Sequence, residues 1–199
     1  MSVWAIILTA SLAQNVILVH YLGVWPLPVV LQSPRRAMAL SASITAALVW
    51  VSAVYWVIRR LVIEPLGVDV LDTLVLTTIL ALSTLGAMRL GSQIAPYYRK
   101  RIMQTVPVVV VNTTVFVVSM GLVRSVETYP HVLLGAIAAG AGLFFALVPL
   151  AAVRVHFDRT RSPASLLRGD VSVYLATAVM ALAIQQIDVL LQRFLVPLY

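Results

Sequence analysis

The chain contains no cysteine. This absence excludes disulfide bonds, thioether attachment of haem, thiolate metal ligands and thiol nucleophiles. The sequence also lacks a serine hydrolase arrangement, a phosphate-binding Walker loop and a metalloprotease motif. We therefore expect no catalytic residue, no metal site and no cofactor held by thiolates of this chain.

Charged residues are scarce as well. Only 11% of the residues are charged and 61% are hydrophobic, and the mean hydropathy is +1.00. A soluble domain carries roughly 25% charged residues, so the composition predicts an all-α integral membrane protein. The net charge is +7, and the basic residues lie mainly in short loops. In a membrane protein such residues set the orientation of the chain in the bilayer. Too few aromatic residues flank the basic ones to indicate nucleic-acid binding.

Six apolar segments are long enough to span a bilayer, which takes about 20 residues. They are Val3–Gly23, Ala37–Ile58, Val70–Leu90, Ile102–Val123, Val132–Val153 and Val171–Leu191. No stretch between them could form a soluble domain, so we predict one membrane domain over residues 1–199. The first segment lacks a basic start and a cleavage site, which favours a membrane helix over a signal peptide.

The distribution of Lys and Arg predicts the topology. Ten basic residues lie in the loops after the first, third and fifth segments, and four lie on the other side. The ten are Arg35, Arg36, Arg89, Arg99, Lys100, Arg101, Arg154, Arg159, Arg161 and Arg168. The positive-inside rule places these in the cytoplasm. Both termini are then expected outside, in the periplasm if the chain lies in a bacterial inner membrane.

The two halves of the chain share three features at similar offsets. Asn112 lies 97 positions after Asn15, Pro130 lies 96 positions after Pro34, and Asp170 lies 101 positions after Asp69. We interpret this as two inverted repeats of three helices, about residues 1–95 and 96–199. In inverted repeats, broken helices place a site near the midplane, so we expect breaks in helices 1 and 4.

Polar residues interrupt the first and fourth segments. Gln14, Asn15 and His20 occupy the first, while Asn112 and Thr113 occupy the fourth. A buried amide must find a hydrogen-bond partner. These residues can join helices to one another, or they can line a shared central site. In the second case a transporter or ion channel with a polar midmembrane site is the alternative function.

Charges also gather at the predicted outer ends of the second and third segments. The group contains Arg59, Arg60, Glu64, Asp69 and Asp72. Helix capping and loop charges are one interpretation, with Asp69 as the cap of the third segment. A mouth that attracts cations is the other. Residues 135–142, GAIAAGAG, indicate close helix packing through small side chains.

Three stretches carry a family resemblance. LAQNVILVHYLGVWP, residues 12–26, is similar to a family pattern that reads L-V-N-N-F-V-L-V-x-F-L-G-x-C-P. PVVVVNTTVFVVSMGL, residues 107–122, is similar to P-L-I-T-T-N-C-A-V-L-G, and LLRGDVSVYLATAVMALA, residues 166–183, is similar to a weaker third pattern. The chain thus resembles the six-helix membrane subunits of the Rnf and Nqr redox-driven ion pumps, and favours their A/E type.

The resemblance implies an iron–sulfur cluster site, but this chain lacks the cysteine ligands of that site. In the family, each polar break carries a Cys, and two subunits together hold one iron–sulfur cluster that relays electrons across the bilayer. Here Trp25 and Thr113 stand at those two positions, while Asn15 and Asn112 remain. Such clusters need thiolates, so we expect this chain not to ligate one. The iron–sulfur cluster and flavins are then expected in partner subunits.

The resulting hypothesis is a membrane subunit of an Rnf/Nqr-like complex, not catalytic on its own. Its expected partners are a homologous six-helix subunit of the E/D type, the other complex subunits and membrane lipid. The family's chemistry is electron transfer between ferredoxin or NADH and NAD or quinone, coupled to sodium or proton movement. A divergent complex, a scaffold paralogue and a redox-independent transporter all remain open at this stage.

Overall fold

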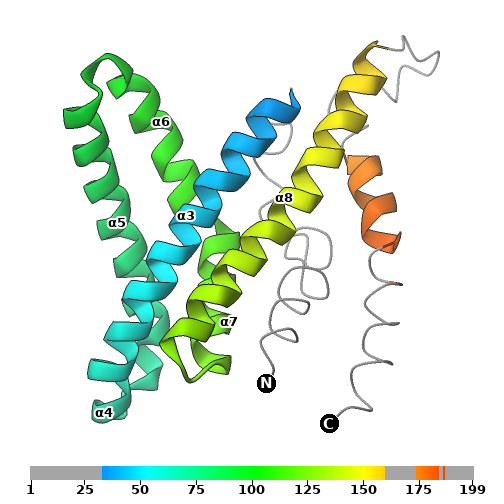
Figure 1. The fold of residues 1–199 in the computed structure, drawn as a ribbon. Helices are drawn as coiled ribbons and strands as arrows, with labels where there is room; N and C mark the ends of the chain where they lie inside the picture. The colour runs from blue at the N-terminus through cyan, green and yellow to red at the C-terminus, as the bar shows by residue number, and fades with distance from the viewer. Residues whose placement is uncertain (1–32, 160–173, 184–185, 187–199) are drawn as a thin grey trace. The chain divides into compact units, whose positions relative to one another are not determined.

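A computed structural model describes residues 33–159, 174–183 and 186, and every regular element in those ranges is a helix (Figure 1). The predicted first span, with Asn15 and Trp25, lies outside the described residues. Three described helices are long and apolar enough to cross a membrane, and a bent pair makes up to four. The prediction of a multi-pass helical membrane protein is confirmed to this extent.

The second predicted span forms one long rod. Helix α3 covers Pro34–Ile58, and the rod continues through a π-helical turn, η2, at Arg59–Ile63 and a short helix, α4, at Glu64–Leu66. Ser33 begins the rod, where its hydroxyl accepts from the backbone N–H of Arg36. Gly67 ends it with a φ of 63°, a left-handed conformation that favours glycine at a helix C-terminus.

The third span begins one turn later than its predicted cap. A 3-10 turn, η3, covers Asp69–Leu71, and α5 then runs over Asp72–Ile94. The prediction that Asp69 caps this helix is wrong, since neither helix start has a side-chain cap. The Asp69 carboxylate instead lies 3.8 Å from an Arg59 guanidinium nitrogen, a competing partner that a local cap pattern does not reveal.

The fourth predicted span is divided. After the turn η4 at Pro96–Tyr98, α6 covers Arg99–Val110 and α7 covers Thr113–Ser125. The two helices are bent by 43° at the break between them, so the prediction of a broken helix 4 is confirmed. Helix α8 then covers Tyr129–Arg159. A further short apolar helix lies at Tyr174–Ala183, within the predicted sixth span.

The chain divides into two compact units. Residues 43–137 form one of them, and its core contains fully buried Leu48, Val51, Tyr55, Leu76 and Val115. The described residues outside that range belong to the other, where Leu143, Leu147 and Leu150 of α8 are buried. Many large apolar side chains remain exposed, among them Trp50, Leu82 and Phe145, as expected for surfaces that face lipid or another membrane protein.

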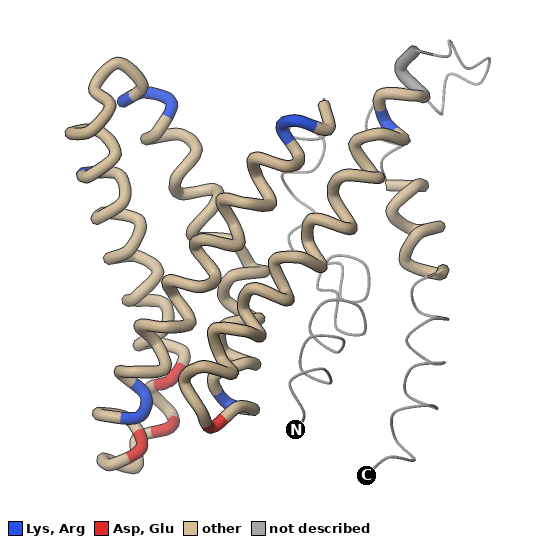
Figure 2. Tube along the Cα trace, viewed as in Figure 1, with Lys and Arg blue, Asp and Glu red and all other residues tan. Residues whose placement is uncertain are grey.

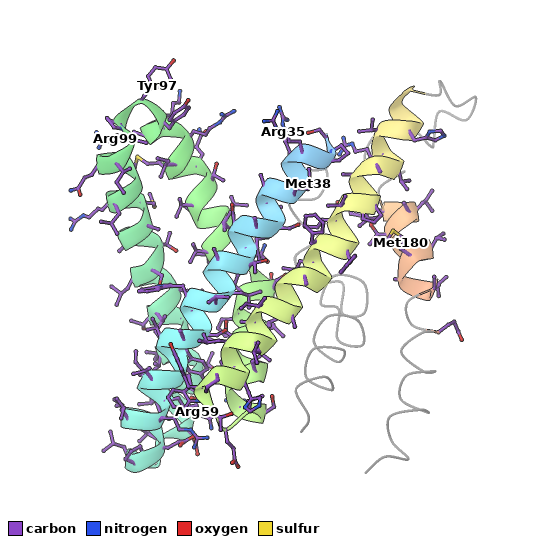
Figure 3. All side chains as sticks on the ribbon, viewed as in Figure 1. Arg35, Met38, Arg59, Tyr97, Arg99 and Met180 are labelled. Carbon is purple, nitrogen blue, oxygen red and sulfur yellow. The ribbon has the colours of Figure 1, made fainter. Side chains whose placement is uncertain are left out.

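Within residues 43–137 the charges lie at opposite ends. Figure 2 shows Asp and Glu in red at the end that holds η2 and η3, and a basic group in blue at the α5–α6 turn. Figure 3 places Arg59 at the first end and Tyr97 and Arg99 at the second. The intervening helices carry the apolar residues that a spanning unit requires.

The prediction of small-residue packing is supported at Gly135. A Cβ atom at this position would lie 2.6 Å from Cδ2 of Leu122, so α8 passes α7 at close range there. We expect Gly135→Leu to destabilise the protein by about 1–3 kcal/mol, because overpacking forces side chains and backbone apart. Adding Leu122→Ala should recover most of that loss in a detergent thermal melt. No recovery in the double variant would contradict this packing.

Candidate functional site

The polar break lies between α6 and α7. Pro107 stands inside α6, where it lacks a donor and clashes with the preceding turn. The last bond of this helix runs from the Val111 N–H to the Pro107 carbonyl at 2.9 Å. Asn112 then takes an extended conformation, with φ −98° and ψ 136°. The helix stops and restarts within two residues.

Asn112 caps the restarted helix. Its Oδ1 accepts from the backbone N–H of Thr114 at 2.9 Å, and its own carbonyl accepts from the N–H of Phe116 at 3.1 Å. Asparagine is among the best N-cap residues because its side chain satisfies an orphan amide of the first turn. Only 7% of Asn112 is exposed. The side-chain oxygen of this buried amide thus finds its hydrogen-bond donor at the break itself.

Thr113 differs from its neighbour in burial. It is the first residue of α7 and is exposed, whereas Asn112 and Thr114 on either side are buried. The two described candidate residues, Asn112 and Thr113, are therefore adjacent, one facing inward and one accessible. Asn15 and Trp25 lie outside the described residues, so their proximity to this break stays a prediction.

A buried hydroxyl pair holds α7 at its middle. The Ser52 hydroxyl of α3 donates to Ser119 Oγ of α7 at 3.0 Å, and both side chains are fully buried. Each serine thus satisfies the other away from water. Sequence reasoning missed this pair. The only available signal was a single serine in each of two otherwise apolar stretches.

A second attachment lies at the far end of α7. The Arg124 guanidinium donates to Asp72 Oδ2 through Nε at 3.0 Å, and its Nη2 lies at the same distance. The Asp72 side chain is 1% exposed and that of Arg124 is 47% exposed. Two-nitrogen contact with one carboxylate is a strong, directional ion pair. It joins the start of α5 to the end of α7.

Asp72 belongs to a larger ionic cluster, formed by the residues that contact it and their neighbours. These are Arg59, Arg60, Glu64, Asp69, Asp72 and Arg124. Arg59 Nε lies 3.9 Å from Asp72 Oδ1, and Arg60 Nη1 donates to Glu64 at 2.7 Å. Arg60 also donates to the Glu127 carbonyl at 3.2 Å.

The ionic cluster is electrically balanced, with three arginines facing three carboxylates. Every carboxylate in it lies within 4 Å of a guanidinium, so none offers a free negative charge to a cation. The arrangement favours the structural interpretation of these residues over a cation mouth. Sequence reasoning found five members but missed Arg124, which lies 52 positions after Asp72.

The residues present do not fit an iron–sulfur cluster. Such clusters are held by thiolates, and the chain has no cysteine. At the break, Val111 and Thr113 are both exposed, and the Thr113 hydroxyl, the polar one of the two, is a poor replacement for a thiolate. The described residues also contain no group of three or more His, Asp or Glu able to hold a metal ion.

Known proteins resemble this chain over nearly its whole length. The family model described as "Rnf-Nqr subunit, membrane protein" matches residues 3–191. The A subunit of the Na⁺-translocating ferredoxin:NAD⁺ oxidoreductase complex of Acetobacterium woodii is 21% identical over 89% of this chain and 92% of that protein. The A subunit of the ion-translocating oxidoreductase complex is 22% identical in Rhodobacter capsulatus and 23% in Syntrophotalea carbinolica, with the same coverage. The chain belongs to the Rnf-Nqr family of membrane subunits.

Proposed function

We propose that the chain is a membrane subunit of an ion-translocating oxidoreductase complex of the Rnf/Nqr type. The single observation that carries the proposal is the break capped by Asn112, which lies within the stretch where the sequence resembles the family's ligand-bearing helix. Similar relatives are named as the A subunits of such complexes. Neither observation favours the transporter alternative.

The proposed topology has six helices in two inverted repeats, with both termini outside the cytoplasm. Three spans and a bent pair support the count for the described residues. The basic group at the α5–α6 turn (Figure 2) supports the orientation, because short basic loops stay in the cytoplasm. In this topology the first helix carries Asn15 and Trp25 as the counterpart of the α6–α7 break.

The proposed partner is a homologous six-helix subunit of the E/D type. Thr113 is exposed at the break, so α7 begins at a surface that another subunit can cover. Without cysteine, this half of the interface offers Trp25 and Thr113 at the family's two ligand positions, beside the retained Asn15 and Asn112. Any midmembrane cluster and the flavins then belong to other subunits, and this chain contributes the protein frame around the electron relay.

The test is affinity purification of the tagged chain from native membranes, with mass spectrometry of the partners, iron and flavin assays, and low-temperature EPR. We expect flavin-bearing subunits and a homologous membrane protein to co-purify. Any cluster signal should be unchanged in Trp25→Ala and Thr113→Ala variants, because neither side chain ligates iron. A stable, active homo-oligomer free of cofactors and partners would refute the proposal and favour the transporter.

A further inference from the structure

An apolar groove lies between α3, α5 and α6 within residues 43–137. Its cavity measures about 690 Å³, and Figure 1 shows the three helices that surround it. The walls include Trp50 and Val54 of α3, Leu82 and Gly86 of α5, and Val109 of α6. The wall reaches Ile58 and Val110, close to the ionic cluster and to the Asn112 break, but it contains no residue of the cluster and not Asn112 itself.

Two features keep the groove open. The Trp50 indole N–H donates to Ser83 Oγ at 3.2 Å, which joins α3 to α5 and fixes the indole in the wall. At Gly86, a Cβ atom would meet nothing within 4 Å, so the absence of a side chain leaves empty space in the groove. Trp50 is 60% exposed, and a molecule in the groove would therefore contact its ring.

The groove is long enough for an extended acyl chain. Its wall runs from Ile79 to Leu90 on α5 and from Ser43 to Ile58 on α3, which is about 16 Å and about 22 Å at 1.5 Å per residue. Half of the hydrocarbon core is roughly 15 Å thick. The narrow apolar wall suits an extended acyl chain.

One end of the groove carries unbalanced positive charge. Arg89 directly precedes the last wall residue of α5, and Arg99, Lys100 and Arg101 open α6. All four are exposed, and no acidic residue occurs between Asp72 and Glu127. None of the four forms an ion pair within the described part of the chain, whereas the arginines of the ionic cluster are all paired.

We infer that this groove binds an anionic phospholipid. One acyl chain lies along α5 against Trp50 and Gly86, and the phosphate lies at the basic α5–α6 turn. Charge complementarity decides the headgroup, since juxtamembrane Lys and Arg attract anionic lipids. The inference rests on the geometry of residues 43–137 and does not depend on the proposed redox role.

The test uses fluorescence quenching in nanodiscs of the full chain with its co-purifying subunits. About one lipid in ten is brominated on its acyl chain, either as phosphatidylglycerol or as phosphatidylcholine. The Trp50 signal is the difference between the parent protein and its Trp50→Phe variant. We expect at least twofold stronger quenching of this signal by the brominated anionic lipid.

Two variants and one matched control locate the lipid. Gly86→Leu fills the groove, and a variant with Arg89, Arg99, Lys100 and Arg101 all changed to Gln removes the charge. Each should abolish the anionic preference. Gly121→Leu adds the same side chain at another open helical position and should preserve it. If Gly86→Leu does not fold, the charge variant alone decides.

Three results would overturn the inference. Equal quenching by the two lipids would show no headgroup selectivity. A preference that survives in Gly86→Leu would place the lipid outside the groove. Absence of quenching by either lipid would mean that protein covers the groove, whether a partner or another segment of this chain.

Discussion

Replacing Asp72 with alanine is expected to destabilise the protein by about 1.5–3 kcal/mol, because it removes the buried acceptor of a charge-assisted hydrogen bond from the half-exposed Arg124. Asp72 is the most buried carboxylate of the ionic cluster, at 1% exposed, and it accepts from Arg124 at 3.0 Å. The substitution also leaves the Arg59 guanidinium, whose side chain is 15% exposed, without its nearest buried anion. The measurement is thermal or denaturant unfolding in detergent micelles.

Asp69 provides a matched control for this prediction. It belongs to the same ionic cluster and lies near the same arginine, but its side chain is 71% exposed. Exposed ion pairs contribute about 0–1 kcal/mol, so Asp69→Ala should have little effect. Equal losses in the two variants would contradict the distinction between a buried and an exposed carboxylate.

A double-mutant cycle then isolates the contact with Arg124. Asp72→Asn keeps the side-chain size, Arg124→Gln shortens the side chain, and both substitutions remove the charge. If the contact joins α5 to α7 as the distances indicate, the double variant should be less destabilised than the sum of the single variants, by at least about 1 kcal/mol. Additive losses would mean that Arg124 does not stabilise Asp72.

The membrane spans that the structure describes were predictable because a span depends only on its own stretch of sequence. A bilayer demands about 20 consecutive apolar residues, and each of the second, third and fifth segments supplies them without help from the rest of the chain. The break at Asn112 was predictable for a related reason. An amide that prefers helix starts follows Pro107, which disfavours the helix interior, and both signals lie within six residues.

The attachments of α7 were not predictable, since each depends on a partner far away in the sequence. Ser52 and Ser119 are 67 positions apart, and a lone serine in an apolar stretch gives no indication of its partner. At Asp69 the local pattern itself was misleading. It predicted a helix cap, whereas the carboxylate lies beside the Arg59 guanidinium. Local patterns therefore placed the helices, and only tertiary structure revealed how they are joined.

Replacing Asn112 with alanine is expected to cost about 1–2 kcal/mol of stability, because the Thr114 N–H loses its capping acceptor in a buried site. The same loss should loosen the start of α7, the element that presents Thr113 to the surface. We therefore expect the yield of co-purified partner subunits to fall severalfold relative to the parent chain. Thermal unfolding and quantitative affinity purification measure the two effects.

Two further substitutions distinguish the capping hydrogen bond of Asn112 from a direct contact between its amide and a partner subunit. Asn112→Ser keeps a capping oxygen and should retain most of the stability and partner yield. Thr113→Ala changes the exposed neighbour without touching the cap, so its stability should match the parent. If Asn112→Ser loses partners as fully as Asn112→Ala while remaining folded, the amide itself contacts the partner. If Asn112→Ala leaves both stability and partner yield unchanged, the capped break does not organise the interface, and the proposed role of α7 is wrong.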